Sequence, residues 1–447
     1  MIVLDTTIVN VALPTIRNDL GYEDTSLIWV VNAYTLSYSA SLLLGGRLGD
    51  LYGRRRIFIL GTAAFTFFSL VCGLVRAPGL LVIARALQGF GGAAVVTVGL
   101  PLILTLFTDQ PRRARAVGAY ALVCSGGAGV GVLLGGLLTA FMSWHWIFFV
   151  NVPIGISVCL LSLVTIRDTQ DRATKTPLDV GGAIAITLSI ALVIYALSFG
   201  PRIDWDTISA LALSALAAFG LFLGLELYGR HPLVPLGIFR SRNFAVANLV
   251  AALWAVASAA WYFVATLYMQ RALGFGPLAI GLVFLPGNLV SAVLSLGLAP
   301  SLITRFGIKA TIAAGLMLTS FGFFLSALHF ARWSSVTEMT AILLIVGVGE
   351  GLTFNPLLLA VTQATVPERV GLASGILETV CVLSGSVGVA MLTSIATTHT
   401  TNLLSAGIAA RPALAGGYHM AFGVAALCAA LGTVLNFAFL KQIPSTP

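Results

Sequence analysis

Four ionisable side chains stand in stretches of sequence that are otherwise almost entirely apolar: Asp5, Arg85, Glu350 and Glu378. Apolar surroundings disfavour the charged form of a carboxylate, whereas a nearby guanidinium favours it, so Asp5 could gain and lose a proton near neutral pH. The guanidinium of Arg85 stays charged, so it can tune an acid but cannot carry the proton itself. Residue type and placement therefore predict a proton-handling pair in Asp5 and Arg85.

The two glutamates stand apart from that pair in the sequence. Glu350 lies between Gly349 and Gly351, which leave room around its carboxylate, and Glu378 lies in the apolar run 370–396. A charge kept in apolar surroundings usually has a task or a partner, and acidic side chains attract cations. We expect both glutamates to contact substrate.

Three aromatic residues, Trp254, Trp261 and Tyr268, recur at intervals of seven. On an α-helix this spacing places them on one face. Aromatic rings there can stack on flat or cationic ligands, which makes the three residues candidate substrate contacts. Packing or lipid contact is the alternative explanation.

Each charged residue also has a structural alternative. Asp5 could accept hydrogen bonds from Asn10 or Thr6, and Arg85 could extend toward the outer interface. The two glutamates could form ion pairs or hydrogen bonds between helices.

Composition identifies the solvent around these residues. The 447 residues are 58% hydrophobic and only 9% charged, with a mean hydropathy of +1.00, whereas soluble domains average about 25% charged residues. Apolar runs of about 20 residues recur, as helices need to cross a bilayer, and they are too long for barrel strands. The fold class is therefore an all-α polytopic membrane protein.

Reading along the chain, we expect fourteen apolar helices, at residues 1–16, 27–49, 57–76, 79–106, 114–141, 145–166, 178–199, 207–227, 243–270, 277–302, 310–330, 336–361, 370–396 and 415–440. An even number places both termini on one side. Most of the 24 Lys and Arg residues then lie in loops on the side of the termini, which predicts that both termini are cytoplasmic. The first predicted helix is short, so we expect the natural start to lie upstream of Met1.

Two pairs of loops indicate an internal repeat. "YGRRR" at 52–56 matches "FGIK" at 306–309, and the loop before residue 114 matches the loop before residue 370 with nearly the same offset. Chance matching of Gly, Pro and Arg is the alternative. The repeat predicts a six-helix bundle at 1–166, a linker with two inserted helices at 167–242, and a second six-helix bundle at 243–447.

Several motifs carry a family resemblance. They are "LDTTIVNVALPTI" at 4–16, "GRLGDLYGRRR" at 46–56, "LVIARALQGFGGA" at 81–93 and "WHWIFFVNVPIG" at 144–155. With the glycines of the fifth predicted helix, these stretches resemble the fourteen-helix drug:proton antiporter branch of the major facilitator superfamily (the EmrB/QacA type), over nearly the whole chain.

The resemblance implies a major facilitator fold of two six-helix bundles plus two extra helices, in the plasma (inner) membrane of a bacterium. It implies a proton-coupled secondary exporter of lipophilic, cationic drugs or toxic compounds that works by alternating access. A dedicated exporter of one metabolite, antibiotic or lipid would have a similar sequence. We expect a monomer that contacts membrane lipid, small-molecule substrate and protons, with no nucleic-acid partner, cofactor or metal.

The motifs also imply gating residues. In the loop after the second predicted helix these are Asp50, Gly53, Arg54 and Arg55, which can form a charge-assisted lock. The simpler role of the arginines is to keep the loop in the cytoplasm.

In the fifth predicted helix the gating residues are Gly127, Gly131 and Gly135, whose four-residue spacing lets backbones approach closely. Two residues depart from the family pattern: Val132 replaces a proline that would kink the helix, and His145 replaces an arginine.

Other classes of function fit the residues less well. A membrane-embedded enzyme needs a nucleophile with its base or a metal cluster, and the five histidines have no ligand spacing. A channel needs a polar pore, and the duplication with buried charges suits alternating access better. The chain has no nucleotide-binding loop of the G-x-x-x-x-G-K-[ST] type, so ATP is not expected to drive it directly.

Overall fold

A computed structural model describes residues 1–22, 24–27, 29–107, 109–166, 179–199, 204–229, 234, 236–329, 336–366 and 370–441. The described chain is helical and divides into two units. Unit 1 comprises Met1–Tyr120, Val130–Leu236 and Pro367–Thr379, and unit 2 comprises Ala121–Gly129, Gly237–Val366 and Val380–Pro447.

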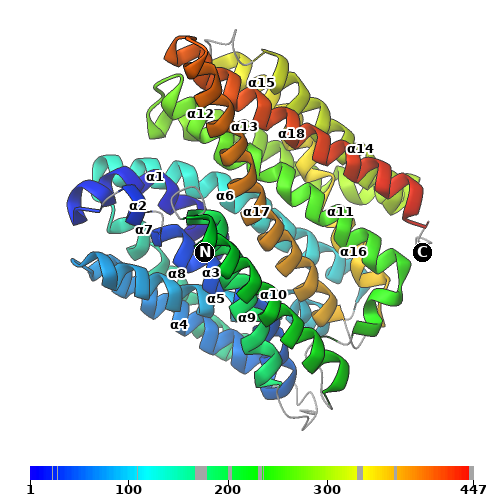
Figure 1. Ribbon diagram of the computed structural model, residues 1–447. Coiled ribbons are helices and arrows are strands. Elements are labelled where there is room, and N and C mark those ends of the chain that lie inside the picture. Colours follow the sequence, from blue (N-terminus) through cyan, green and yellow to red (C-terminus); the bar gives the residue numbers. More distant parts are fainter. Residues whose placement is uncertain are drawn as a thin grey trace. The chain divides into compact units, whose positions relative to one another are not determined.

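Unit 1 contains the first ten helices of the chain, apart from a short stretch of α6 (Figure 1). Helix α5 packs against α3 and α4, α8 packs against α4, and α9 packs against α3 and α10. The bounds are α1 (Ile2–Leu20), α2 (Asp24–Leu27), α3 (Trp29–Tyr52), α4 (Arg54–Leu74), α5 (Pro78–Leu106), α6 (Gln110–Phe141), α7 (Trp146–Phe149), α8 (Asn151–Thr165), α9 (Val180–Phe199) and α10 (Trp205–Tyr228).

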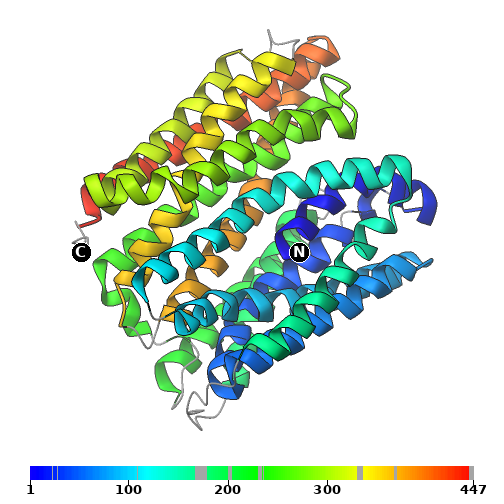
Figure 2. The ribbon, with the colours of Figure 1, turned by 180° about the vertical axis from the view of Figure 1, so that it is seen from behind.

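Unit 2 contains the remaining helices, apart from the first residues of α17. Helix α14 lies beside α18 and α15, α13 packs against α15, and α11 packs against α18 (Figures 1 and 2). The bounds are η2 (Leu236–Arg240), α11 (Arg242–Ala259), η3 (Ala260–Val264), α12 (Ala265–Arg271), α13 (Pro277–Leu296), α14 (Leu298–His329), α15 (Val336–Gly351), α16 (Phe354–Gln363), α17 (Val370–Ser405) and α18 (Ala410–Phe439).

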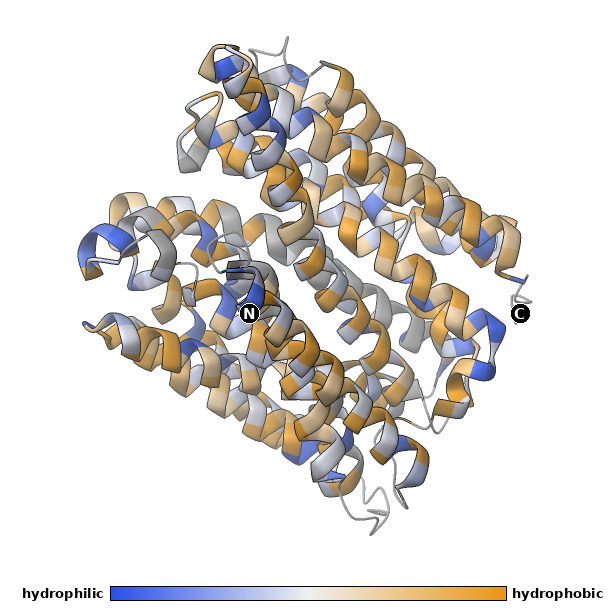
Figure 3. Cartoon of the chain, viewed as in Figure 1, coloured by the Kyte–Doolittle hydropathy of each residue, from blue (hydrophilic) through white to orange (hydrophobic). Residues whose placement is uncertain are grey.

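The helices have the length and polarity of membrane spans. Within the described residues, nine helical stretches are long and apolar enough to cross a bilayer, and three shorter apolar helices accompany them. Hydrophobic residues run along most of each helix, and hydrophilic residues gather mainly at helix ends (Figure 3). Each predicted apolar stretch coincides with one helix or with two or three consecutive helices. Fourteen crossings, and the bundle boundaries at 166 and 242, stay predictions.

Helix α10 shows how its sequence sets its ends. Asp204 begins it as an N-cap, accepting hydrogen bonds from the backbone N–H and the hydroxyl of Thr207 at 3.0 and 2.8 Å. These bonds lower the pKa of Asp204 below its usual value. Trp205 and Tyr228, at opposite ends of the helix, are 81% and 89% exposed, as expected of aromatic side chains at the two membrane interfaces.

The aligned loops of the repeat share a backbone conformation. Gly53 precedes α4 with φ 92°, and Gly307 interrupts α14 with φ 83°. Residues with a Cβ rarely adopt this left-handed region, so glycine sets the turn in both loops. This agreement supports the alignment of the two sequence motifs.

In unit 1, two glycines of α6 allow helix α1 to pack closely against α6. A Cβ built on Gly131 would lie 2.7 Å from the Leu4 carbonyl oxygen, and one built on Gly135 would lie 2.8 Å from the Ile8 carbonyl oxygen. The neighbours are backbone atoms, which cannot rotate away. Gly127 lies one turn earlier on the same helix. The glycine spacing read from the sequence therefore produces close helix packing at α1.

Gly135→Ala is expected to lower the free energy of unfolding by about 1–3 kcal/mol, because the added methyl group overpacks the α1–α6 contact. Thermal unfolding of the purified protein in nanodiscs measures the effect. Gly220→Ala is the matched control, since a Cβ there meets nothing within 4 Å. Equal effects of the two substitutions would contradict the packing role of Gly135.

Candidate functional site: a buried ion pair in unit 1

The carboxylate of Asp5 lies at the centre of a buried polar network in unit 1. Arg85 Nη1 donates to Asp5 Oδ2 at 2.6 Å. Gln88 Nε2 and Asn151 Nδ2 donate to Asp5 Oδ1 at 3.0 and 2.9 Å. All four side chains are at most 1% exposed. The sequence prediction that Asp5 and Arg85 come together is therefore correct in this structure.

Arg85 makes further contacts that fix its orientation. Its Nε donates to the Val30 carbonyl oxygen at 3.0 Å, and its Nη1 also donates to Gln88 Oε1 at 2.8 Å. The guanidinium carbon lies 4.2 Å from the centre of the Tyr34 ring, a cation–π distance. Arg85 therefore does not extend to the outer interface, which excludes the snorkelling alternative.

Asn151 connects Asp5 to helix α4 and to the short helix α7. Its Nδ2 also donates to Ser69 Oγ at 3.1 Å, and Ser69 Oγ donates to the Phe148 carbonyl oxygen at 3.0 Å. The network thus joins residues of α1, α3, α4, α5, α7 and α8. A change in the charge of the Asp5 carboxylate therefore alters a hydrogen-bond network to which six helices contribute.

The contacts of Asp5 determine what a proton would do there. Its two oxygens accept three side-chain hydrogen bonds, from one guanidinium and two amides. These bonds occupy three of the roughly four lone-pair sites of the carboxylate, and Oδ2 keeps one site for a proton. A proton there would remove the negative charge, so the hydrogen bonds from the guanidinium and the two amides would lose their charge assistance. Protonation and the strength of the network are therefore linked.

The structure also excludes the alternative that Asp5 accepts hydrogen bonds from Asn10 or Thr6 of its own helix. Asn10 Nδ2 donates to the Thr6 carbonyl oxygen, and Thr6 Oγ1 donates to the Val3 carbonyl oxygen. Both groups hydrogen-bond to the backbone of α1. The partners of Asp5 come instead from helices far along the chain.

Glu350 lies in unit 2 and has its own partner. Ser258 Oγ donates to Glu350 Oε1 at 2.8 Å, and the Trp254 side chain lies beside the same carboxylate. The residue is half-buried. The apolar stretch predicted at 336–361 corresponds to a span over Thr337–Gln363. The sequence prediction misses a break in that span just after Glu350, because α15 ends at Gly351 and α16 begins at Phe354.

The aromatic residues of the same segment do not share one environment. Trp254 packs near Phe354, whereas Trp261 and Tyr268 are 1% and 2% exposed and belong to the core of unit 2. The π-helical turn η3 contains Trp261 and changes the helical phase that a seven-residue spacing assumes. Their substrate contacts stay predictions, with Trp254 the one beside an acid.

Glu378 lies in the part of α17 that belongs to unit 1, where the Tyr38 hydroxyl faces its carboxylate. It is half-buried. The structure therefore places Glu350 and Glu378 in different units, each beside a hydroxyl group.

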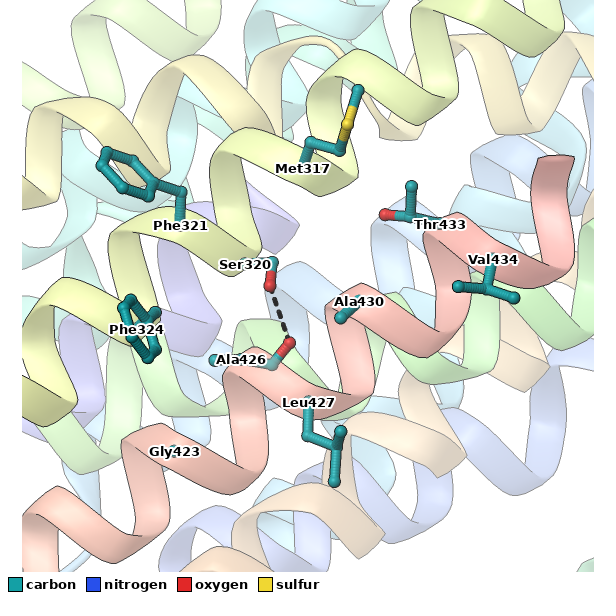
Figure 4. Close-up of a pocket in the computed structure, with 10 residues that line it drawn as sticks. All are labelled: Met317, Ser320, Phe321, Phe324, Gly423, Ala426, Leu427, Ala430, Thr433 and Val434. Carbon is teal, nitrogen blue, oxygen red and sulfur yellow. Dashed lines mark hydrogen bonds between the residues drawn. The ribbon is translucent and has the colours of Figure 1, made fainter.

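Unit 2 also has a groove that, unlike the surroundings of the acidic residues, is mainly apolar. It has a volume of about 520 Å³ and runs between α14 and α18, with Phe321 and Phe324 among its lining residues (Figure 4). Its Ser320 and Thr433 hydroxyls donate to backbone carbonyl oxygens. With these hydroxyls already bonded and the aromatic side chains about half exposed, the groove suits lipid better than a charged ligand.

Comparison with known proteins shows which family the chain belongs to. The family model described as Major Facilitator Superfamily matches residues 1–389. The chain belongs to the Major Facilitator Superfamily. This is a family of membrane transporters, and the chain is accordingly a multi-pass membrane transporter rather than an enzyme.

Individual relatives support this assignment. The chain is 34% identical over 399 residues to the cephamycin export protein CmcT of Amycolatopsis lactamdurans, covering 88% of this chain and 82% of the relative. It is 33% identical over 398 residues to the multidrug resistance protein Stp of Mycobacterium tuberculosis, covering 88% and 73%. Its fold resembles that of the human organic anion transporter MFSD10, with a TM-score of 0.64, 16% identity and coverage of 97% and 96%.

Within this superfamily fold, the predicted gating residues are only partly defined. Arg55 Nη2 donates to the Leu163 carbonyl oxygen at 2.9 Å, near the end of α8. Asp50 lies near the end of α3, and its side chain is outside the described part of the structure, as is that of Val132. The gating roles of Asp50, Gly53, Arg54 and Arg55 stay predictions.

His145, which replaces the arginine of the family pattern, lies at the same end of unit 1 as Asp19. The His145 ring stacks on Trp144 at 3.8 Å between ring centres, and Trp144 Nε1 donates to Asp19 Oδ2 at 2.8 Å. Burial lowers the pKa of His145 below its usual value, while Asp19 opposes the shift. A neutral imidazole at pH 7 therefore replaces the charge that the family pattern has here.

Replacing Arg85 alone leaves a buried carboxylate without its counter-ion. Arg85→Met is expected to lower the free energy of unfolding by about 3–5 kcal/mol. The double variant Asp5→Asn/Arg85→Met should recover most of that loss, because it removes both charges. Denaturant unfolding of the purified protein measures both variants.

Arg112 supplies the control for this prediction. It lies 3.9 Å from Asp109 in an exposed ion pair, so Arg112→Met should cost less than about 1 kcal/mol. If the double variant lost as much stability as Asp5→Asn and Arg85→Met lose when each is made alone and the two losses are added, Asp5 and Arg85 would not act as a pair.

Proposed function

We propose that the chain is a proton-coupled exporter of lipophilic, cationic drugs, working by alternating access in the plasma membrane of a bacterium. The observation that carries this proposal is the buried Asp5–Arg85 pair. The similarity to CmcT, a cephamycin export protein, and to Stp, a multidrug resistance protein, supports drug export. Proton coupling rests on the family resemblance and on the chemistry of the pair.

In the proposed mechanism, Asp5 is the group that takes up the proton. A neutral Asp5 no longer balances the charge of Arg85, and its hydrogen bonds to the surrounding donors become weaker. Gln88 or Asn151 can move more readily than Arg85, because Arg85 is also bound to Val30 and covers the Tyr34 ring. The rearranged contacts among α1, α5 and α8 then favour a different packing of unit 1, which couples the proton to a conformational change.

Substrate selection is assigned to the two half-buried glutamates. Glu350 has one neutral donor, Ser258, and Glu378 faces Tyr38. Among the described residues, neither glutamate forms a salt bridge, so each can serve as counter-ion for a cationic substrate. We infer that the glutamates and Trp254 recognise substrate, with Trp261 and Tyr268 in support, while Asp5 and Arg85 handle the proton.

A dedicated exporter of one compound is the second candidate. The name of CmcT specifies a single antibiotic class, whereas that of Stp specifies several drugs. The two candidates share the proton site and differ in the breadth of substrates. We further propose that the protein acts as a monomer with both termini in the cytoplasm.

The test is a transport assay in inverted membrane vesicles with an imposed pH gradient. Lipophilic cations such as tetraphenylphosphonium should collapse part of the gradient with the unmodified protein. Asp5→Asn should abolish this response, because the carboxylate can no longer gain and lose a proton. Response to one compound in a panel, rather than to several, would favour the dedicated exporter.

Two further variants make this assay decisive. Asp206→Asn, an exposed acid in the first turn of α10, should leave the response unchanged. Glu350→Gln should weaken the response to cations and spare that to neutral substrates. A full response in Asp5→Asn vesicles would refute the proposed proton site.

A further inference from the structure

A cluster of polar side chains in unit 2 extends beyond Glu350. Tyr262 Oη donates to Asn288 Oδ1 at 2.9 Å, and Tyr262 lies close enough to Glu350 for the two to interact electrostatically. Glu350 in turn accepts from Ser258. Three elements supply this cluster: the segment α11–η3, helix α13 and helix α15. Neither Tyr262 nor Asn288 stands out in the sequence.

The cluster holds one buried donor without an acceptor. Asn288 is 3% exposed, and among the described residues its Nδ2 has no hydrogen-bond partner. The indoles of Trp254 and Trp261 lie beside the Glu350 carboxylate and the Tyr262 hydroxyl. A buried donor left unpaired costs about 1–3 kcal/mol. A protein that keeps such a donor near a carboxylate is suited to a ligand that brings an acceptor atom.

The residues of the cluster differ in exposure. Trp254, Ser258, Tyr262 and Glu350 are half-buried, whereas Asn288 is buried. The bond from Tyr262 fixes the Asn288 amide, because its oxygen is occupied and its NH₂ group remains to donate. The neighbouring backbone is irregular, with the π-helical turn η3 on one side and the α15–α16 break on the other. Irregular backbone of this kind is common at functional sites within membrane helices.

We propose that this cluster is a two-point subsite for a substrate that carries a cationic nitrogen and, a few bonds away, an oxygen acceptor such as an ester or amide carbonyl. Glu350 pairs with the cation, and Asn288 donates to the acceptor. Tyr262 is a positioning residue that holds the Asn288 amide. The inference rests on the proposed function for the cation site and adds the requirement for an acceptor.

Two quaternary ammonium probes of similar length separate the two points. Lauroylcholine has an ester carbonyl near its cationic nitrogen, whereas tetradecyltrimethylammonium has the cation alone. Neither titrates, so binding needs no pH gradient and is independent of the Asp5 proton site. Equilibrium dialysis of the radiolabelled probes against the purified protein in nanodiscs, with empty nanodiscs as the blank, gives both dissociation constants.

The unmodified protein is expected to bind lauroylcholine about five- to tenfold more tightly than tetradecyltrimethylammonium, the effect of roughly one hydrogen bond. Asn288→Leu should remove this preference and change the affinity for tetradecyltrimethylammonium by less than about twofold. Asn288→Asp keeps the size and offers no donor when ionised, so it should also lose the preference while still binding both cations. Tyr262→Phe should reduce the preference in part, because the amide loses its fixed orientation.

Asn248→Leu is the matched control. Asn248 is a buried asparagine of unit 2 whose Nδ2 donates to the Phe244 carbonyl oxygen, and its loss should leave the preference intact. Equal binding of the two probes by the unmodified protein, or a preference that survives in Asn288→Leu, overturns the two-point subsite. Failure to bind either probe overturns the subsite together with the cation site of Glu350. Proton coupling is judged separately, by the vesicle assay.

Discussion

A charge in a lipid-surrounded protein needs a counter-charge, and in unit 1 this constraint organises the structure around Asp5 and Arg85. The pair is fully buried, and side chains and a carbonyl group from several helices hydrogen-bond to it. Gln88 and Asn151 satisfy the second carboxylate oxygen, and Val30 and Tyr34 constrain the guanidinium. The helices of unit 1 are thus joined through a group whose charge a single proton can cancel.

The sequence predicts the two charged residues of this site, Asp5 and Arg85. It does not predict the two amide side chains that hydrogen-bond to Asp5. A carboxylate and a guanidinium stand out in apolar segments because their burial is costly. Gln88 and Asn151 cost much less to bury, so composition and spacing give them no comparable signal. Their only trace in the sequence is their position within the motifs at 81–93 and 144–155, where Asn151 follows "WHWIFFV".

The helices of unit 2 show a second limit of sequence reasoning. Hydrophobic runs reveal where helices lie, because crossing a bilayer requires about 20 apolar residues. They do not reveal the π-helical turn at Ala260–Val264 or the break after Gly351, since a local change of helical phase leaves hydropathy unchanged. As a result the spacing of Trp254, Trp261 and Tyr268 indicates a shared face, whereas the structure buries two of them in the core.

The left-handed glycines at 53 and 307 bear on how tolerance to substitution is interpreted in this chain. A Cβ at either position would meet nothing within 4 Å, yet both residues have positive φ. The constraint therefore lies in the torsion angles and not in any neighbour. A saturation survey would find few acceptable side chains at the two sites even if neither loop ever moved during transport, so intolerance there reports the shape of a turn and carries no information about a gate.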